Sequence, residues 1–232
     1  NYKNSLKNFD KAITKKTKII FIANPNNPTG TYLSTKELNK FIKNLPKRIL
    51  LVIDAAYAEY ITKRDYSSGI DMVKKNNNII MTRTFSKIYG LAGLRLGWAY
   101  CPKYVADIFN KVRLPFNINR AAMEAGIAAL NDKNFFIKSI KHNTFYLNWL
   151  NNELIKLGLT PIPSVANFIL VKFPSNGKFS AKKVNNYLLS KGIILRNVDS
   201  YDLRDFLRIS IGKKNELTKL IKFLKIYFKK KI

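Results

Sequence analysis

Three groups of polar residues each follow a run of apolar residues, and their side chains are of types that do chemistry. The first group, residues 24–30, reads NPNNPTG; the second contains Asp54 and Tyr57; the third contains Lys87 and Arg95. In a parallel α/β sheet, ligands bind at the edge where the carboxyl ends of the strands lie. We therefore expect the three groups to converge on one site.

The residue types suit an aromatic aldehyde as the bound group. A lysine near a strand end and among apolar residues can have its pKa lowered and can form a Schiff base with an aldehyde, and Lys87 has that position. Asp54 is suited to pair with a ring nitrogen and keep it protonated, which makes the ring an electron sink. Asn27 and Tyr57 offer hydrogen bonds to an oxygen on the same ring.

A phosphate group on this ring would also find partners. Thr84, Ser86 and Arg95 offer two hydroxyls and a guanidinium, and arginine binds phosphate in a bidentate manner. Each feature has an ordinary structural interpretation when taken alone: NPNNPTG is a typical turn, and an aspartate after a strand often caps the next segment. The chemical interpretation rests on their combination and order.

Three nearly continuous motifs carry a family resemblance. NPNNPTG is followed by DAAYAEY at 54–60 and by TFSKIYGLAGLRLGW at 84–98. In this order they resemble the fold-type I aminotransferases of classes I and II, and within them most closely the histidinol-phosphate aminotransferase branch. The resemblance covers essentially the whole chain, with further agreement in VRLPFNIN at 112–119, ANFIL at 166–170, GIILR at 192–196 and FLRISIG at 206–212.

The resemblance implies pyridoxal 5'-phosphate as the cofactor. Lys87 would bind it and would move the proton between the substrate carbon and the cofactor. Asp54 would contact the pyridine nitrogen, and the hydroxyls and guanidinium of the third motif would contact the phosphate. The residues that the resemblance assigns to the cofactor are Asn27, Asp54, Tyr57, Thr84, Ser86, Lys87 and Arg95.

Two arginines in the second half are implied to bind the substrate. Arg208 would hold its anionic group, and Arg196 stands where this branch has a second arginine. Together they favour a phosphate-bearing substrate, although a surface salt bridge is another interpretation of Arg196. The implied reaction, part of histidine biosynthesis, converts histidinol phosphate and 2-oxoglutarate into imidazole-acetol phosphate and glutamate.

Several alternatives stay open at this point. Aromatic-amino-acid aminotransferases and a threonine-phosphate decarboxylase share these motifs, and a catalytically inactive remnant would keep the same fold. A basic nucleic-acid-binding protein is an alternative from another class, because the chain has 42 Lys and Arg residues and only 14 acidic residues, which gives a net charge of +28. However, the basic residues are spread along the whole chain and no binding motif is found, so we expect no nucleic-acid partner.

The composition is that of an ordinary globular protein, with 47% hydrophobic residues. No apolar run approaches the roughly 18 residues that would span a membrane, so no membrane partner is expected.

Cys101 is the only cysteine, which excludes an intrachain disulfide and favours a reducing, cytoplasmic location. With His142 as the only histidine, we expect no metal site. The resemblance implies a homodimer.

The pattern of apolar residues predicts a mainly parallel α/β domain over residues 1–131. Ser34 and Glu37 form a capping box ahead of an amphipathic helix that ends near Pro46. Helical segments between short apolar runs indicate βαβ units. The strands are predicted at 18–23, 49–53, 78–82 and 94–100.

A small α+β domain is predicted over residues 132–232, and it begins with a long linking helix at 132–157. Gly158 follows this helix, as is typical of a helix end. Further strands are predicted at 167–173, 193–196 and 206–211, and further helices at 180–191 and 215–228.

The family also has a substantial region ahead of the point where this sequence starts. The resemblance places there a Gly/Ser-rich phosphate-binding turn, an aromatic residue that stacks on the cofactor, and an arm that closes over the substrate. We therefore expect the large domain to be truncated at its N-terminus and the sequence to be part of a longer protein. As a whole polypeptide it would bind the cofactor weakly, and part of its sheet would lack its neighbours.

Overall fold

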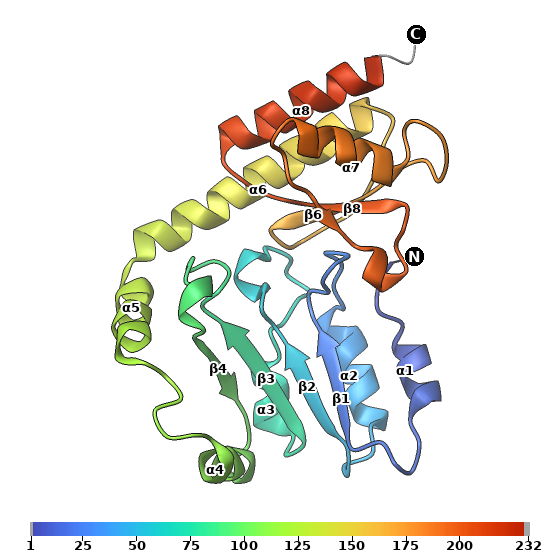
Figure 1. The fold of residues 1–232 in the computed structure, drawn as a ribbon. Coiled ribbons are helices and arrows are strands. Elements are labelled where there is room, and N and C mark those ends of the chain that lie inside the picture. Colours follow the sequence, from blue (N-terminus) through green and yellow to red (C-terminus); the bar gives the residue numbers. More distant parts are fainter. Residues whose placement is uncertain (1, 230–232) are drawn as a thin grey trace. The chain divides into compact units, whose positions relative to one another are not determined.

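The structure is a computed structural model in which residues 2–229 are described. They form two compact units (Figure 1). The first contains residues 3–26 and 32–140, and the second contains Tyr2, residues 27–31 and residues 141–229. The domain division proposed at residue 132 stays a prediction, because compactness alone does not define a domain that folds by itself.

The first unit is built on a four-stranded sheet. Its strands lie in the order β1-β2-β3-β4, where β1, β2 and β3 are parallel and β4 is antiparallel to β3. The predicted mainly parallel sheet is confirmed. The strands are β1 (Ile19–Ala23), β2 (Leu50–Asp54), β3 (Ile79–Thr84) and β4 (Gly97–Tyr100).

The strand predicted at 94–100 is wrong at its start. Ala92–Leu94 forms a 3-10 turn, η2, and Arg95 follows with φ 54°. This left-handed conformation cannot continue a strand, so β4 begins only at Gly97.

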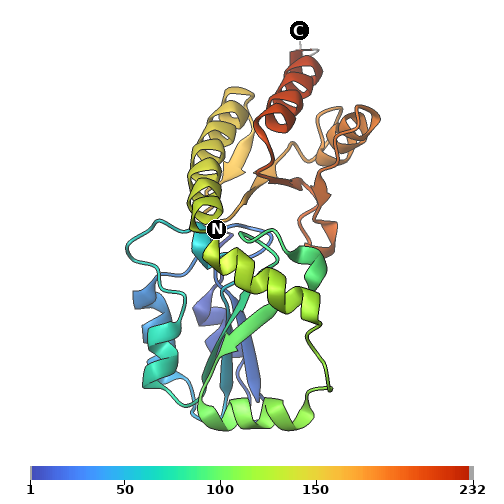
Figure 2. The same ribbon diagram turned by 90° about the vertical axis from the view of Figure 1, so that its left-hand side faces the viewer.

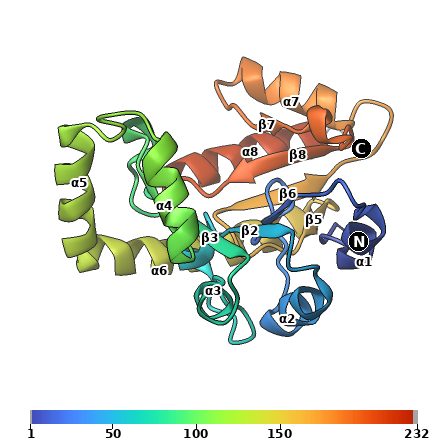
Figure 3. The ribbon, with the colours of Figure 1, turned by 90° about the horizontal axis from the view of Figure 1, so that it is seen from below.

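Helices cover one face of this sheet. They are α1 (Leu6–Ala12), α2 (Thr35–Asn44) and α3 (Ile70–Lys75), and Figure 3 shows α2 and α3 side by side on that face. Alternate strand residues point toward them, as the period of two requires. The buried side chains of that layer include Ile20, Ile22, Leu51, Ile53, Ile79 and Met81. Each such side chain contributes about 1.5–3 kcal/mol to folding.

The opposite face is covered less. Helix α4 (Lys103–Val112) lies across the end of the sheet where the parallel strands begin (Figure 1 and Figure 2). Its Val105 packs against Val52 and Ile80 in a small cluster. On the outermost strand β1, Ile19 is 50% exposed and Phe21 is 67% exposed. The two faces are therefore buried unequally.

The second unit pairs three helices with an antiparallel sheet. The sheet order is β5-β6-β8-β7, and leucines of α6 (Leu150 and Leu154) are fully buried in the core between the helices and this sheet. The elements are α6 (Lys133–Lys156, which begins in the first unit), β5 (Thr160–Ile162), β6 (Phe168–Lys172), α7 (Ala181–Ser190), β7 (Arg196–Asn197), β8 (Phe206–Ser210) and α8 (Lys214–Lys229). The predicted small α+β unit is confirmed.

The strand predicted at 193–196 is almost entirely absent. Only Arg196 and Asn197 pair with β8. The amide of Ile193 instead donates to the Leu188 carbonyl at 2.9 Å, where Gly192 with φ 71° closes the end of α7. The end of the helix therefore uses a backbone group that the strand would need.

Candidate active site

Asp54 ends the central strand of the parallel part of the first sheet. Its neighbours in the register are Ala23 on β1 and Thr82 on β3. One carboxylate oxygen accepts a hydrogen bond from the Ala56 amide at 3.1 Å, and the side chain is exposed. Asp54 can therefore cap the turn and also bind a ligand, because its carboxylate accepts a hydrogen bond within the turn and is exposed at the predicted edge of the sheet.

Tyr57 and Lys87 come from different motifs and lie together. The Lys87 Nζ atom is 5.3 Å from the centre of the Tyr57 ring. A cation within about 6 Å of an aromatic ring is attracted by it. Tyr57 is 6% exposed and Lys87 is half-buried, so the Lys87 amine lies beside a buried aromatic ring.

The three residues predicted to hold a phosphate also lie together. The Thr84 hydroxyl oxygen accepts from the Ser86 amide at 3.0 Å. The Arg95 guanidinium donates to the Ser86 Oγ at 3.4 Å and to the Ala92 carbonyl at 2.9 Å. Arg95 is exposed, so two hydroxyls and a guanidinium are grouped beside Lys87 in the sequence and in space.

The loop that carries Lys87 is closed by its own backbone. Phe85 and Leu96 are joined by an amide-to-carbonyl hydrogen bond of 3.0 Å. Helix α5 (Arg120–Asn131) approaches Leu96 so closely that a Cβ added at Gly126 would lie 2.5 Å from its Cδ2 atom. Close packing at the base of the loop restricts where Lys87 can lie.

In the second unit, the structure joins Asn27 to Arg208. The Arg208 Nη1 atom donates to the Asn27 Oδ1 at 2.6 Å, and the guanidinium carbon is 4.8 Å from the Phe168 ring centre. Its Nε atom is buried and has no hydrogen-bond partner within residues 2–229. This donor is available to another acceptor.

Arg196 lies opposite Arg208 in the antiparallel pair β7–β8. Both line a cavity of about 830 Å³. Like charges directly opposite each other destabilise a strand pair, and a bound anion would offset that repulsion. Among the described residues Arg196 makes no ion pair, so the salt-bridge interpretation gains no support.

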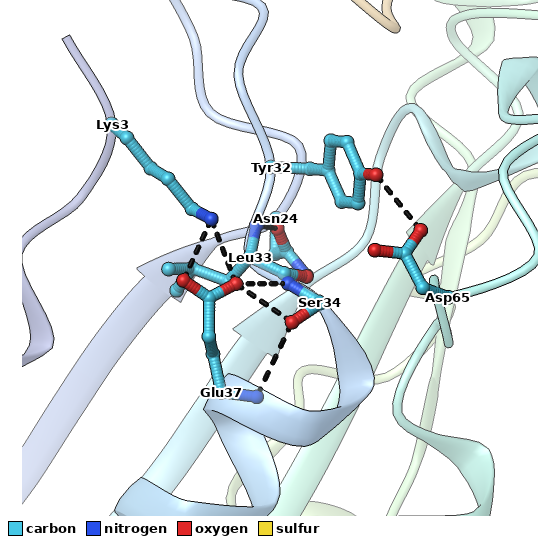
Figure 4. A network of polar contacts seen from close by, with 7 residues as sticks. All are labelled: Lys3, Asn24, Tyr32, Leu33, Ser34, Glu37 and Asp65. Carbon is cyan, nitrogen blue, oxygen red and sulfur yellow. Dashed lines mark hydrogen bonds and ion pairs between the residues drawn. The ribbon is translucent and has the colours of Figure 1, made fainter. Parts of the chain in front are cut away.

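Asn24, the first residue of the NPNNPTG motif, supports the loop in a way that its sequence position alone does not predict. Its side chain is fully buried: Oδ1 accepts from the Leu33 amide at 2.7 Å, and Nδ2 donates to the Leu33 carbonyl at 3.0 Å (Figure 4). The Tyr66 hydroxyl donates to the Asn24 carbonyl at 2.8 Å, and burial raises the pKa of this hydroxyl. Asn24 thus closes the base of the loop that contains NPNNPTG, and its place after an apolar run was the available signal.

The description "aminotransferase class I and II" belongs to a family model that matches residues 1–224. The chain belongs to the class I and II aminotransferase family. Within residues 2–229 this aminotransferase chain has no group of three or more His, Cys, Asp or Glu residues that could hold a metal ion. None of its described helices combines the length and apolarity that crossing a membrane requires.

Curated relatives of this aminotransferase chain carry a common name. A histidinol-phosphate aminotransferase from Paramagnetospirillum magneticum (strain ATCC 700264 / AMB-1) is 50% identical over 214 residues, which are 92% of this chain and 59% of that protein. One from Pelagibacter ubique (strain HTCC1062) is 47% identical over 229 residues, 98% of this chain and 63% of that protein. The chain therefore spans about three fifths of the length of these relatives.

A solved structure has the same fold. The histidinol-phosphate aminotransferase from Sinorhizobium meliloti, crystallised in complex with pyridoxal-5'-phosphate, superposes with a TM-score of 0.83 at 30% identity. The match covers 93% of this chain and 58% of that one. The aminotransferase fold is thus present over nearly all of the sequence.

Proposed function

We propose that this chain binds pyridoxal 5'-phosphate at Lys87 and takes part in transamination of histidinol phosphate with 2-oxoglutarate. The observation that carries the proposal is the arrangement of Lys87, Tyr57 and Asp54 at the ends of β2 and β3 in a chain of this family. The names of the relatives, and the cofactor in the Sinorhizobium meliloti structure, support it.

The donor set fits the cofactor group by group. An amine suits the aldehyde, an exposed carboxylate suits the protonated ring nitrogen, and hydroxyl groups with a guanidinium suit the phosphate. The residues that would supply these groups are Lys87, Asp54, Tyr57, Thr84, Ser86 and Arg95, with Asn27 assigned to the ring oxygen by the resemblance.

The protein's part in the reaction is to hold and to move a proton. When bound, the cofactor supplies an electron sink that makes the α-proton of an amino group's carbon removable. The Asp54 carboxylate would keep the ring nitrogen protonated. The Lys87 amine would take the proton from the substrate carbon and return it to the cofactor side, while Tyr57 limits the positions of that amine.

The arginine pair favours a substrate with a phosphate group. Among residues 2–229 the buried Nε of Arg208 has no hydrogen-bond partner, and Arg196 stands directly across from Arg208 with the same charge. A dianionic phosphate would balance both positive charges and accept hydrogen bonds from both guanidinium groups. Histidinol phosphate carries such a group, and an aromatic amino acid does not.

We also propose that the protein acts in the cytoplasm and as a homodimer. A single cysteine is what a reducing compartment favours. The resemblance to the family supports the dimer. Gel filtration with light scattering tests the second statement, and a monomer at micromolar concentration would reject it.

The experiment for the reaction is a single half-turnover. The chain is loaded with cofactor and mixed with histidinol phosphate, histidinol, phenylalanine or threonine phosphate, and conversion of each amine is measured by mass spectrometry. Conversion of histidinol phosphate alone, with loss of that preference in Arg196→Gln, supports the proposal. Equal conversion of histidinol would reject the phosphate-binding role of the arginines, and conversion of phenylalanine or threonine phosphate would favour the related enzymes.

A further inference from the structure

A largely buried ion pair joins Glu59 to Arg83 in the first unit. The Arg83 guanidinium donates from Nη2 at 2.7 Å and from Nε at 3.1 Å to one carboxylate oxygen of Glu59. The side chains of Arg83 and Glu59 are only 15% and 6% exposed. The other carboxylate oxygen of Glu59 is buried and has no hydrogen-bond partner in the described part of the chain. Such a pair is costly to break from one side, because the remaining charge stays buried.

The ion pair connects the segment that carries Tyr57 to the segment that carries Lys87. Glu59 lies in the 3-10 turn η1 (Ala58–Tyr60), directly after Tyr57, and Arg83 lies in β3 ahead of Lys87. The guanidinium carbon of Arg83 is also 5.7 Å from the ring centre of Trp98, its neighbour in the register of β4. The guanidinium is therefore held by a carboxylate and by a ring.

The pair lies on the other side of the sheet from Asp54. Thr82 is opposed to Asp54, and successive strand residues alternate between faces, so Arg83 points to the opposite face. The pair nevertheless borders the Lys87 loop, because Arg83 directly precedes Thr84, whose hydroxyl oxygen accepts from the Ser86 amide at 3.0 Å. Burial raises the pKa of the Tyr89 hydroxyl in that loop, Glu59 adds to the rise and Arg83 opposes it. Its effect on the site would therefore pass through the segments that it joins.

We propose that Glu59 and Arg83 are positioning residues that hold Tyr57 beside Lys87 and so orient the Lys87 amine. The turn that contains Tyr57 is also held by backbone hydrogen bonds, from the Ala58 amide to the Ala55 carbonyl at 3.1 Å and from the Ala55 amide to the Thr82 carbonyl of β3 at 3.0 Å. Two donors of one rigid guanidinium that meet the same carboxylate oxygen fix direction as well as distance. The inference rests on the proposed function only in taking Lys87 as the reactive amine.

The test measures the position of the Lys87 amine in the cofactor-free chain. Its amines are reductively methylated with ¹³C-formaldehyde, and the Lys87 signal is assigned by its loss in Lys87→Arg. The Tyr57 ring should shift this signal away from those of exposed lysines. The matched control is the exposed ion pair Lys103–Asp107, with side chains 88% and 49% exposed, changed to Gln and Asn.

In Glu59→Gln/Arg83→Gln, the Lys87 signal is expected to collapse onto the signals of exposed lysines, and in the control it should stay in place. Arg83→Lys should restore part of the shift, because it keeps the charge without the fork. An unchanged signal in a double variant that circular dichroism shows to be folded would overturn the proposal. If the double variant does not fold, Arg83→Lys decides alone: a Lys87 signal that moves toward those of exposed lysines supports positioning, and a signal unchanged from the parent chain overturns it.

A second readout separates this inference from the proposed function. Displacing the amine by about 1 Å should slow cofactor attachment at Lys87 by up to roughly 10²-fold. If the parent chain binds no cofactor at all, the proposed function fails, while the comparison of methyl signals still tests the role of Glu59 and Arg83.

Discussion

Replacing Asn24 with alanine is expected to destabilise the first unit strongly. The side chain is fully buried and makes two hydrogen bonds, of 2.7 and 3.0 Å, to the backbone of Leu33, which is itself 2% exposed. Alanine would leave the buried amide and carbonyl of Leu33 without these partners. Leaving a buried polar group unsatisfied costs about 1–3 kcal/mol, so the loss in the free energy of unfolding should be about 2–4 kcal/mol.

The two tryptophans of the chain allow each unit to be followed separately. Trp98 lies in the first unit and Trp149 in the second. In a Trp149→Phe background, the fluorescence of Trp98 during urea unfolding therefore reports the first unit. At a typical slope of about 2 kcal/mol per molar urea, Asn24→Ala should lower the midpoint by roughly 1–2 M.

The matched control for Asn24→Ala is Asn131→Ala, which changes an exposed asparagine at the end of α5. This surface change should alter the free energy by no more than about 0.5 kcal/mol. A loss below about 1 kcal/mol for Asn24→Ala would refute the reasoning, because the loop would then be held without this side chain.

Three further changes test other contacts by urea unfolding, and the two changes in the second unit are followed by Trp149 in a Trp98→Phe background. Burial raises the pKa of Glu37, but the ion pair with Lys3 and the capping hydrogen bonds outweigh this effect and lower the pKa to about 2. The stability that these contacts contribute is fully present above the ordinary pKa of 4.5. It should be lost as the pH falls through about 2. Since Glu37 is 41% exposed, the loss should be on the order of 1 kcal/mol, and a midpoint with the same pH dependence in Glu37→Gln would contradict it. Gly30→Ala should cost the second unit about 1–3 kcal/mol, because Gly30 has φ 75° and a Cβ there would overlap the Ser164 side chain; an unchanged midpoint would speak against this. Leu154→Ala should cost the second unit about 2–5 kcal/mol, and a loss below about 1 kcal/mol would mean that the core around this fully buried leucine is not close-packed.

Much of the fold followed from patterns within short segments. The apolar runs at 49–53 and 78–82 predicted β2 and β3 because buried parallel strands need continuous apolar sequence. The run at 193–196 has the same appearance but does not pair along its length, because the end of α7 uses the Ile193 amide. Gly192 is the local sign of a helix end at this point, but the partner that the Ile193 amide takes depends on three-dimensional packing.

The candidate site was predictable in its residue types but not in its internal contacts. Lys87 and Tyr57 stood out because each lies in a contiguous motif. The hydrogen bond between Asn27 and Arg208 joins residues 181 positions apart, so no spacing rule reaches it. The partners of Asn24 depend in the same way on how the loop closes.

The most direct measurement is the identity of the lysine that takes up the cofactor. The chain would be incubated with pyridoxal 5'-phosphate, reduced with borohydride and mapped by peptide mass spectrometry, with Lys87→Ala as the control. We expect a near-stoichiometric adduct at Lys87 that is absent from the control. Labelling scattered over the many exposed lysines, or equal labelling in the control, would contradict the assignment of Lys87 as the residue that binds the cofactor in this chain.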